Sequence, residues 1–206
     1  MLEDSIITSF REIGRDIFLR GLISSHAGNM SVRMGDRIYI TRRGSMLGRL
    51  SGKDLVELDI IKNNTQILMA SSETVVHRAI YLNTSALAIV HTHPPYATLL
   101  SMMDDEIIPI DSEGSYLFKK IPVVSLEKTI GSEEAGQIVS EHLKDYKIVL
   151  MRGHGSFARG DMLEEAYMLT SSLESSAFYA YHMKSHEKFD SGQKEYRKFS
   201  DKYKNW

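Results

Sequence analysis

The stretch "ALAIVHTHPPYA", residues 86–97, is an apolar run that ends in two histidines and two prolines. Its first eight residues are typical of a strand that is buried on both faces. Residues two apart on a strand point to the same face, so His91 and His93 lie about 6.6 Å apart along the chain and can converge on one ion. We therefore predict a buried strand whose end carries part of a metal site, with the two prolines stopping the strand just beyond it.

A second stretch, "KIVLMRGHG" (147–155), repeats this pattern, because an apolar strand ends at His154 with a glycine on each side. Imidazole is the most common protein ligand for zinc-like metals, and a catalytic zinc site typically takes three protein ligands. The alternative is that histidines at strand ends hydrogen-bond to the backbone and close the core. Two strands that both end in histidine favour the metal site.

The segment "ASSETVVH" (70–77) predicts the start of a helix, with Ser71 and Ser72 as cap residues and Glu73 just inside. One interpretation is structural, with the carboxylate compensating the helix dipole. The other is functional, because free N–H groups and hydroxyls at a helix start form an anion site. Glu73 would then stand beside a bound phosphate as a possible base.

The rest of the chain alternates helical and strand patterns, which predicts one α/β domain over residues 1–206, with 187–206 as a polar tail that could be mobile. No repeat or Gly-, Ser- or Pro-rich linker divides the chain. The predicted elements are a helix over 3–20, a strand and turn over 36–44, brief strands over 107–110 and 121–126, a helix over 132–146 capped by Ser132, and a long helix from about Asp161.

Composition narrows the class of protein. The 206 residues are 42% hydrophobic, and 25 basic against 27 acidic residues leave a formal charge of −2. Such a chain is expected to be globular and has no overall basic field for nucleic acid or an anionic membrane. It has no cysteine, which excludes disulfides and thiolate ligands. No targeting or membrane-spanning pattern is found, so a cytoplasmic location is the default expectation.

Five motifs in this order resemble the class II aldolase/adducin family, most closely its fuculose-phosphate aldolases. They are "GNMSVR", "ITRRG", "SSE" followed by His77, "IVHTHPPYAT" and "GHGSFARG". The resemblance implies a three-layer α/β/α fold with a central, largely antiparallel sheet. It also implies a homotetramer with four-fold symmetry and active sites at the subunit contacts.

The resemblance implies roles for individual residues. His91, His93 and His154 would hold a divalent metal, usually zinc, and Glu73 would bind the metal at rest or act as the acid/base. The phosphate of a sugar would lie against Gly28, Asn29, Thr41, Gly44, Ser71 and Ser72. The implied reaction cleaves a ketose 1-phosphate, such as L-fuculose 1-phosphate, to dihydroxyacetone phosphate and an aldehyde through a metal-stabilised ene-diolate.

The chain departs from the family pattern at positions that face the variable part of the substrate. Arg43 stands where many relatives have a small hydroxyl residue, so it could strengthen phosphate binding, indicate another substrate or simply be solvated. The aldolases protonate the aldehyde with a tyrosine of a neighbouring subunit, and the candidates here are Glu113 and Tyr116. A second tyrosine of these enzymes lies on the C-terminal tail, where Tyr196 and Tyr203 are candidates. His77 is interpreted as support for the site.

Other functions share the same apparatus. A pentulose-phosphate 4-epimerase and a methylthioribulose-phosphate dehydratase would use the same metal site. A non-catalytic interaction module, like the adducin head domain, would not need it. The presence of all three histidines and of Glu73 favours an enzyme.

Overall fold

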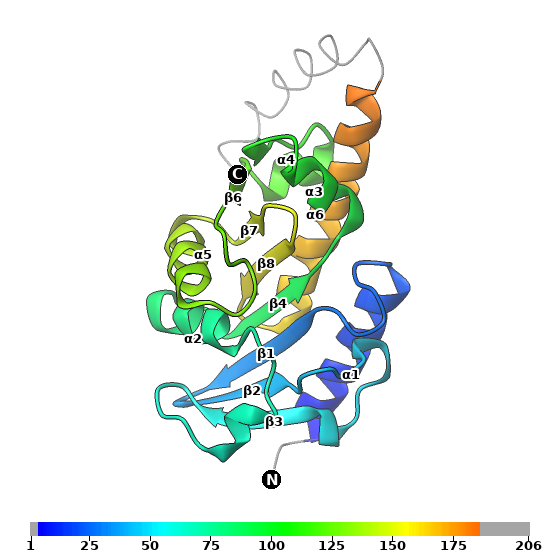
Figure 1. The fold of residues 1–206 in the computed structure, drawn as a ribbon. Coiled ribbons are helices and arrows are strands. Elements are labelled where there is room, and N and C mark those ends of the chain that lie inside the picture. The colour runs from blue at the N-terminus through cyan, green and yellow to red at the C-terminus, as the bar shows by residue number, and fades with distance from the viewer. Residues whose placement is uncertain (1–3, 186–206) are drawn as a thin grey trace.

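Eight strands join in one sheet in the order β3-β2-β1-β4-β8-β7-β6-β5 (Figure 1). The structure is a computed structural model that describes residues 4–185. The strands are β1 Asn29–Met34, β2 Arg37–Thr41, β3 Leu55–Asp59, β4 Ala88–Thr92, β5 Glu106–Ile107, β6 Ile121–Val124, β7 Ile148–Met151 and β8 Gly155–Gly160. Strands β6 and β7 run parallel, and the other neighbouring pairs run antiparallel. The predicted, largely antiparallel sheet is confirmed.

Helices cover both faces of this sheet and enclose a separate apolar core on each side (Figure 1). One face carries α1 Asp4–Leu19, α3 Pro95–Ser101, α4 Ser112–Leu117 and α6 Leu163–Lys184, and the other carries α2 Thr74–Asn83 and α5 Glu133–Asp145. Three short 3-10 helices lie between β2 and α2 in the described part of the chain: η1 Leu47–Arg49, η2 Gly52–Asp54 and η3 Thr65–Leu68. The predicted three-layer α/β/α architecture is confirmed.

Strand β4 lies inside the sheet and is buried along its whole length. It pairs with β1 on one side and with β8 on the other. Both of its faces are covered by helices, which explains why its sequence is apolar without alternation. The strand ends at Thr92, and Pro94 and Pro95 then become the N-cap and first residue of α3. A proline is well accommodated there because the first helical N–H has no partner inside the helix.

Local signals account for the helices that the sequence predicts. In α1, Phe10 and Ile17 are buried on one stripe, as the 3.6-residue period requires. In α5, the Ser132 side chain caps the helix by accepting from the backbone N–H of Ala135, and Glu133 and Glu134 lie in the first turn. Both helices are therefore stabilised at the positions that the pattern identifies.

The structure also corrects several sequence predictions. Strands β3 and β8 and helix α4 were not predicted, and the strand expected over 107–110 covers only Glu106–Ile107 because Pro109 has no N–H for the ladder. The long helix predicted from about Asp161 is confirmed and begins at Leu163. Among residues 4–185, every helix is too short or too polar to cross a lipid bilayer.

Candidate metal centre

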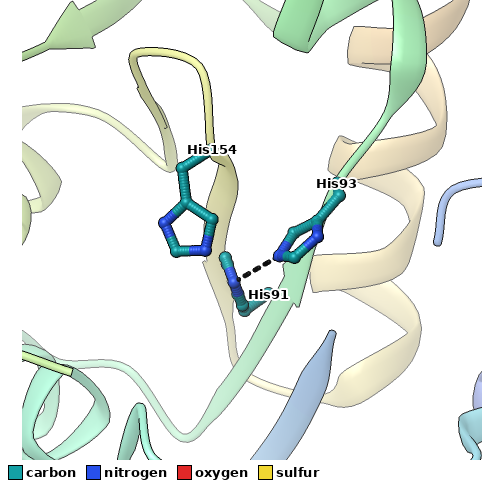
Figure 2. Close-up of side chains that lie close together, drawn as sticks. All are labelled: His91, His93 and His154. Carbon is teal, nitrogen blue, oxygen red and sulfur yellow. Dashed lines mark hydrogen bonds between the residues drawn. The ribbon is translucent and has the colours of Figure 1, made fainter. Parts of the chain in front are cut away.

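Three histidines converge where β4 ends beside the turn that joins β7 to β8. His91 is in β4, His93 follows it, and His154 lies in the turn. Their ligand atoms all lie within 4.8 Å of one another, and each pair of ring centroids is 4.9 Å apart. Figure 2 shows the rings turned toward a common centre. The three predicted ligands therefore meet.

The order of the strands explains this meeting. Strand β8 lies between β4 and β7 and is antiparallel to both, with Thr92 opposite Ser156 and Met151 opposite Gly155. The turn that closes β7 and β8 therefore lies beside the end of β4. His154 belongs to this turn rather than to the end of the strand, which corrects the sequence prediction.

Hydrogen bonds orient the rings. His91 donates from Nδ1 to the carbonyl of Ser156 at 2.9 Å, which leaves its Nε2 without a proton in the neutral ring. That Nε2 faces the Nε2 of His93 at 3.0 Å (Figure 2). The Nδ1 of His154 lies 3.3 Å from the sulfur of Met151. Hydrogen-bond partners of this kind fix the orientation and the tautomer of a histidine ring that binds a metal.

Burial keeps these imidazoles neutral. It lowers the pKa of His91 well below its ordinary value, with the neighbouring rings of His93 and His154 adding to the effect. Burial and the nearby His154 lower the pKa of His93 to about 4, and burial lowers the pKa of His154 as well. Histidine binds metal in its neutral form, so all three rings are in the state that a metal requires.

The geometry fits a divalent ion of the zinc type. Ligands of a tetrahedral zinc lie about 3.3 Å apart for Zn–N bonds of about 2.0–2.1 Å, and the two Nε2 atoms are already 3.0 Å apart. Imidazole donors suit zinc, copper, iron and nickel. A site with three protein ligands also keeps a position open for a substrate.

Glu73 lies at the start of α2 and is 3% exposed. Its Oε1 accepts from the N–H of Gly131 at 3.1 Å, whereas its Oε2 is buried with no partner among the described residues. Burial raises the pKa of Glu73 to about 7, although the Gly131 N–H acts in the opposite direction. Glu73 is outside the set of ligand atoms within 4.8 Å of one another, so its role as a metal ligand stays a prediction.

The cap of α2 differs from the prediction. Glu73 itself occupies the N-cap position, and its side chain does not cap the helix. Ser71 accepts from the N–H of Glu73 through Oγ, and its carbonyl accepts from the N–H and the hydroxyl of Thr74. The serine thus folds the chain into a tight turn ahead of the helix.

Backbone and side-chain contacts join three of the segments predicted to bind phosphate. The Thr41 hydroxyl accepts from the N–H of Met30, and the Thr41 carbonyl accepts from the N–H of Ser71. Asn29 lies opposite His91 in the sheet, is 6% exposed, and has a buried Oδ1 with no partner among the described residues. The segments around residues 29, 41 and 71 are therefore contiguous.

The other predicted phosphate residues shape these segments or stay exposed. Gly28 has φ +76, and a Cβ there would lie 2.9 Å from the carbonyl oxygen of His91, so only glycine fits. Gly44 also has positive φ, with open space around it. Ser72 and Arg43 are exposed, and the Arg43 N–H bonds to the carbonyl of Met69.

His77 supports the site from α2. It is fully buried, and its Nδ1 lies 2.6 Å from the Ser31 hydroxyl, which also bonds to the Tyr81 hydroxyl. Burial lowers the pKa of His77 to about 3. The ring meets Phe157 edge-on, and Phe157 stacks on His91 with 4.1 Å between centroids. Sequence reasoning missed Ser31, Phe157 and Gly131, of which only Gly131 leaves a local signal, a glycine just before a helix cap.

The structure does not bring the predicted aldehyde-side residues into the histidine cluster. The Glu113 carboxylate accepts from the hydroxyl of Ser172 on α6. Tyr116 is 70% exposed on α4. Tyr196 and Tyr203 lie outside the described residues, as does the rest of the predicted tail.

Comparison with known proteins identifies the family of this chain. Residues 9–181 match the family model for the class II aldolase and adducin N-terminal domain. An L-fuculose phosphate aldolase from Methanococcus maripaludis is 34% identical over 171 residues, which cover 82% of this chain and 92% of that protein. A 3-oxo-tetronate 4-phosphate decarboxylase from Haemophilus influenzae is 34% identical over 173 residues, covering 81% of this chain and 82% of that protein.

A solved structure resembles this chain as well. The l-fuculose-1-phosphate aldolase from Thermus thermophilus superposes with a TM-score of 0.82 at 40% identity, covering 86% of this chain and 93% of that one. The match of the family model extends over most of the chain, from α1 to α6. The chain therefore belongs to the class II aldolase and adducin family.

Proposed function

We propose that this protein is a metal-dependent aldolase that cleaves a ketose 1-phosphate, L-fuculose 1-phosphate or a close analogue, to dihydroxyacetone phosphate and an aldehyde. The observation that carries the proposal is the cluster of three neutral histidines, His91, His93 and His154, with ligand atoms within 4.8 Å of one another. The relatives named as L-fuculose phosphate aldolases support the choice of substrate.

We propose zinc as the metal and the three histidines as its ligands. Neutral ligands leave the full charge of the ion available. When bound, such an ion supplies a Lewis acid for the negative charge that develops beside the broken carbon–carbon bond. The protein's own contribution is to hold the rings in place, as the bond from His91 to the carbonyl of Ser156 and the contact of His154 with the sulfur of Met151 do.

Glu73 is the proposed acid/base. A group whose pKa is near the working pH can both take up and release a proton, and the pKa of Glu73 is raised to about 7 by burial. Its Oε1 is held by the Gly131 N–H, whereas its Oε2 has no partner within residues 4–185, so Oε2 is the oxygen we assign to proton transfer. A positioned group of this kind contributes about 10²- to 10⁴-fold to a rate.

The substrate phosphate is proposed to bind at the start of α2, where the first N–H groups lack partners within the helix. The contiguous segments of Asn29, Thr41 and Ser71 border this position, and Gly28, Gly44 and Ser72 belong to the same segments. Arg43 is exposed beside them and would add positive charge. Binding energy from the phosphate then orients the reacting carbons.

The aldehyde side of the site is proposed to be completed by a second copy of the chain, in a homotetramer with active sites at its contacts. Tyr116 would act as the proton donor, because its exposed hydroxyl is available to a neighbouring copy. Glu113 and Tyr203 remain the other proposed groups on this side. The bond from Ser172 to Glu113 makes Glu113 the less available of the two described residues.

A decarboxylase is the second candidate, because a relative with 34% identity is named as a 3-oxo-tetronate 4-phosphate decarboxylase. Loss of carbon dioxide from a 3-oxo acid also leaves negative charge beside a carbonyl, so the same metal site would serve. The epimerase and dehydratase would use this site too. An adducin-like binding module would have no use for three neutral histidines whose ligand atoms converge on one point.

The test compares substrates on one preparation of zinc-loaded protein. We would assay fuculose 1-phosphate, ribulose 5-phosphate, methylthioribulose 1-phosphate and 3-oxo-tetronate 4-phosphate side by side, with unphosphorylated fuculose and chelator-treated protein as controls. The proposal expects dihydroxyacetone phosphate from fuculose 1-phosphate, and none in either control. Turnover of another substrate alone would replace the proposed reaction, and a purified protein that binds no divalent metal would refute it.

A further inference from the structure

The turn that carries His154 is tied to the C-terminal end of α3. The Arg152 side chain donates to the Ser101 carbonyl from Nη1 at 2.5 Å and to the Ser125 hydroxyl from Nε at 2.7 Å. The next residue, Gly153, donates its N–H to the Ser101 hydroxyl at 2.9 Å. Ser101 is fully buried, so it receives two bonds from the turn in a place that water does not reach.

The other end of α3 is tied to the segment that carries His93. The helix begins at Pro95, directly after His93 and Pro94. Its first free N–H groups, those of Tyr96 and Ala97, donate to the two carboxylate oxygens of Glu174 at 3.0 Å each. Helix α3 therefore connects the segment of His93 with the turn of His154.

The contact between Arg152 and α3 is favourable for physical reasons. The last carbonyls of a helix lack partners within the helix, and a cation there is stabilised by the dipole. Arg152 also pairs with Asp105, but the Asp105 side chain is 97% exposed. An exposed pair of this kind contributes little, so the bonds to Ser101 and Ser125 hold the turn.

We propose that Arg152 and Ser101 are positioning residues that hold the His154 turn against α3 and thereby set the affinity of the site for its metal. The inference rests on the proposed metal-dependent function and deepens it. Residues that orient metal ligands typically change metal affinity by about 10- to 100-fold when they are substituted. A purely structural role would instead lower stability and leave metal affinity unchanged.

Arg159 offers a matched control. Its guanidinium also bonds to backbone carbonyls, those of Leu143 at 2.6 Å and Tyr146 at 3.3 Å. It lies on β8 opposite Ile89, further along the strand pair from the site than Phe157, which is opposite His91. Arg159→Ala therefore removes a guanidinium that bonds to backbone carbonyls, as Arg152→Ala does, but at a place that holds none of the three histidines.

The experiment measures zinc affinity by competition with a chromophoric chelator, and the visible spectrum of bound Co²⁺, in the wild type and in Arg152→Ala, Ser101→Ala and Arg159→Ala. Urea unfolding of the metal-free proteins gives their stability. We expect zinc affinity to be about 10- to 100-fold weaker in Arg152→Ala and also weaker in Ser101→Ala. The spectrum of bound Co²⁺ should change in both variants. Arg159→Ala should bind zinc with wild-type affinity. If Arg152→Ala does not fold, Arg152→Lys replaces it, because lysine keeps the charge but cannot reach the same acceptors from a fixed fork.

Wild-type zinc affinity in both Arg152 and Ser101 variants would overturn the inference, as would an equal loss in Arg159→Ala. These outcomes leave the proposed function standing if the wild type binds metal and cleaves its substrate. A wild type that binds metal but cleaves no ketose phosphate would refute the proposed reaction and leave this inference intact. A wild type that binds no metal would overturn both.

Discussion

The Nε2 atoms of His91 and His93 face each other at 3.0 Å. Because His91 donates its Nδ1 proton to the carbonyl of Ser156, its Nε2 presents a lone pair to this contact. In a neutral pair, the proton between the rings has to come from His93. A divalent cation bound at this point would replace that proton and would be met by a lone pair from each ring.

Removing one of these rings should abolish tight metal binding. We expect His93→Ala to lose a large part of its zinc content after purification and dialysis, because two histidines give too few ligands for a stable site. Elemental analysis provides the measurement. The matched control is His142→Ala, since His142 bonds to the Ile138 carbonyl on α5 and is outside the cluster. Full metal content in His93→Ala would contradict the assignment.

Replacement of Glu73 by glutamine should separate metal binding from proton transfer. The amide oxygen can still accept from the Gly131 N–H, but it cannot carry the proton. We expect Glu73→Gln to keep most of its metal while kcat falls by about 10²- to 10⁴-fold. Steady-state kinetics on metal-loaded protein measure this change. Turnover at the wild-type rate would show that another group is the base.

Gly131 should control the pKa of Glu73. It has φ +59, and a Cβ there would lie 2.6 Å from the Ser72 carbonyl oxygen. Gly131→Ala is therefore expected to move the N–H away from Glu73, which raises the pKa of Glu73 further because a bond to the carboxylate is lost. The pH at which kcat rises should move upward, and kcat at neutral pH should fall by about tenfold or more.

Gly35 is the control for this substitution, because it has the same φ of +59 and a Cβ added there would meet nothing within 4 Å. Gly35→Ala carries the backbone strain alone, about 1–2 kcal/mol. It should lower the urea midpoint and leave the pH profile of kcat in place. Equal pH profiles in the two variants would refute the role of Gly131.

The stability of the metal-free protein should depend on pH through its buried groups. The pKa of His77 is lowered from 6.5 to about 3, so below pH 6.5 the unfolded chain binds a proton that the folded chain does not. The free energy of unfolding therefore falls as the pH drops, by up to about 1.4 kcal/mol per pH unit for this residue. His91 and His93 act in the same direction.

Glu73 opposes this trend, which allows a sharp test. Its pKa is raised to about 7, so the folded protein takes up a proton as the pH falls through 7 and gains stability. In Glu73→Gln this gain is lost, and the fall in stability between pH 7 and 5 should be steeper than in the wild type. Urea unfolding at pH 7, 6 and 5 measures both slopes. Equal slopes would mean that Glu73 does not titrate in this range.

Arg43 should affect substrate binding rather than chemistry. Its side chain is exposed beside the predicted phosphate segments. We expect Arg43→Ser to raise KM for a phosphorylated substrate by roughly two- to fivefold with little change in kcat, because exposed charge pairs are weak. Arg49→Ser is the control, because it removes another exposed arginine that is not among the predicted phosphate residues. Higher salt should shrink the difference between wild type and Arg43→Ser, and an unchanged KM would mean that this arginine is only solvated.

Local sequence predicted much of the fold and named the three histidines that the structure brings together. The apolar run before His91 and His93 predicts a buried strand, and the structure has strand β4 there. The period of α1 and the cap of α5 at Ser132 were equally readable. In contrast, β8 was missed because glycines bound it at both ends and Arg159 interrupts its apolar pattern. Strand β3 was missed although its buried Val56 and Leu58 alternate with the acidic Glu57 and Asp59, because the strand is only five residues long.

The sequence alone therefore determined which residues can bind a metal, because that follows from their side-chain chemistry and from the two-residue period of a strand. Only the tertiary structure decided how they meet. The placement of β8 between β4 and β7 brings His154 to His91, and contacts between residues far apart in the chain, Gly131 with Glu73 and Arg152 with Ser101, set their surroundings. Such contacts leave no local pattern, because they depend on the packing of strands and helices around a common core.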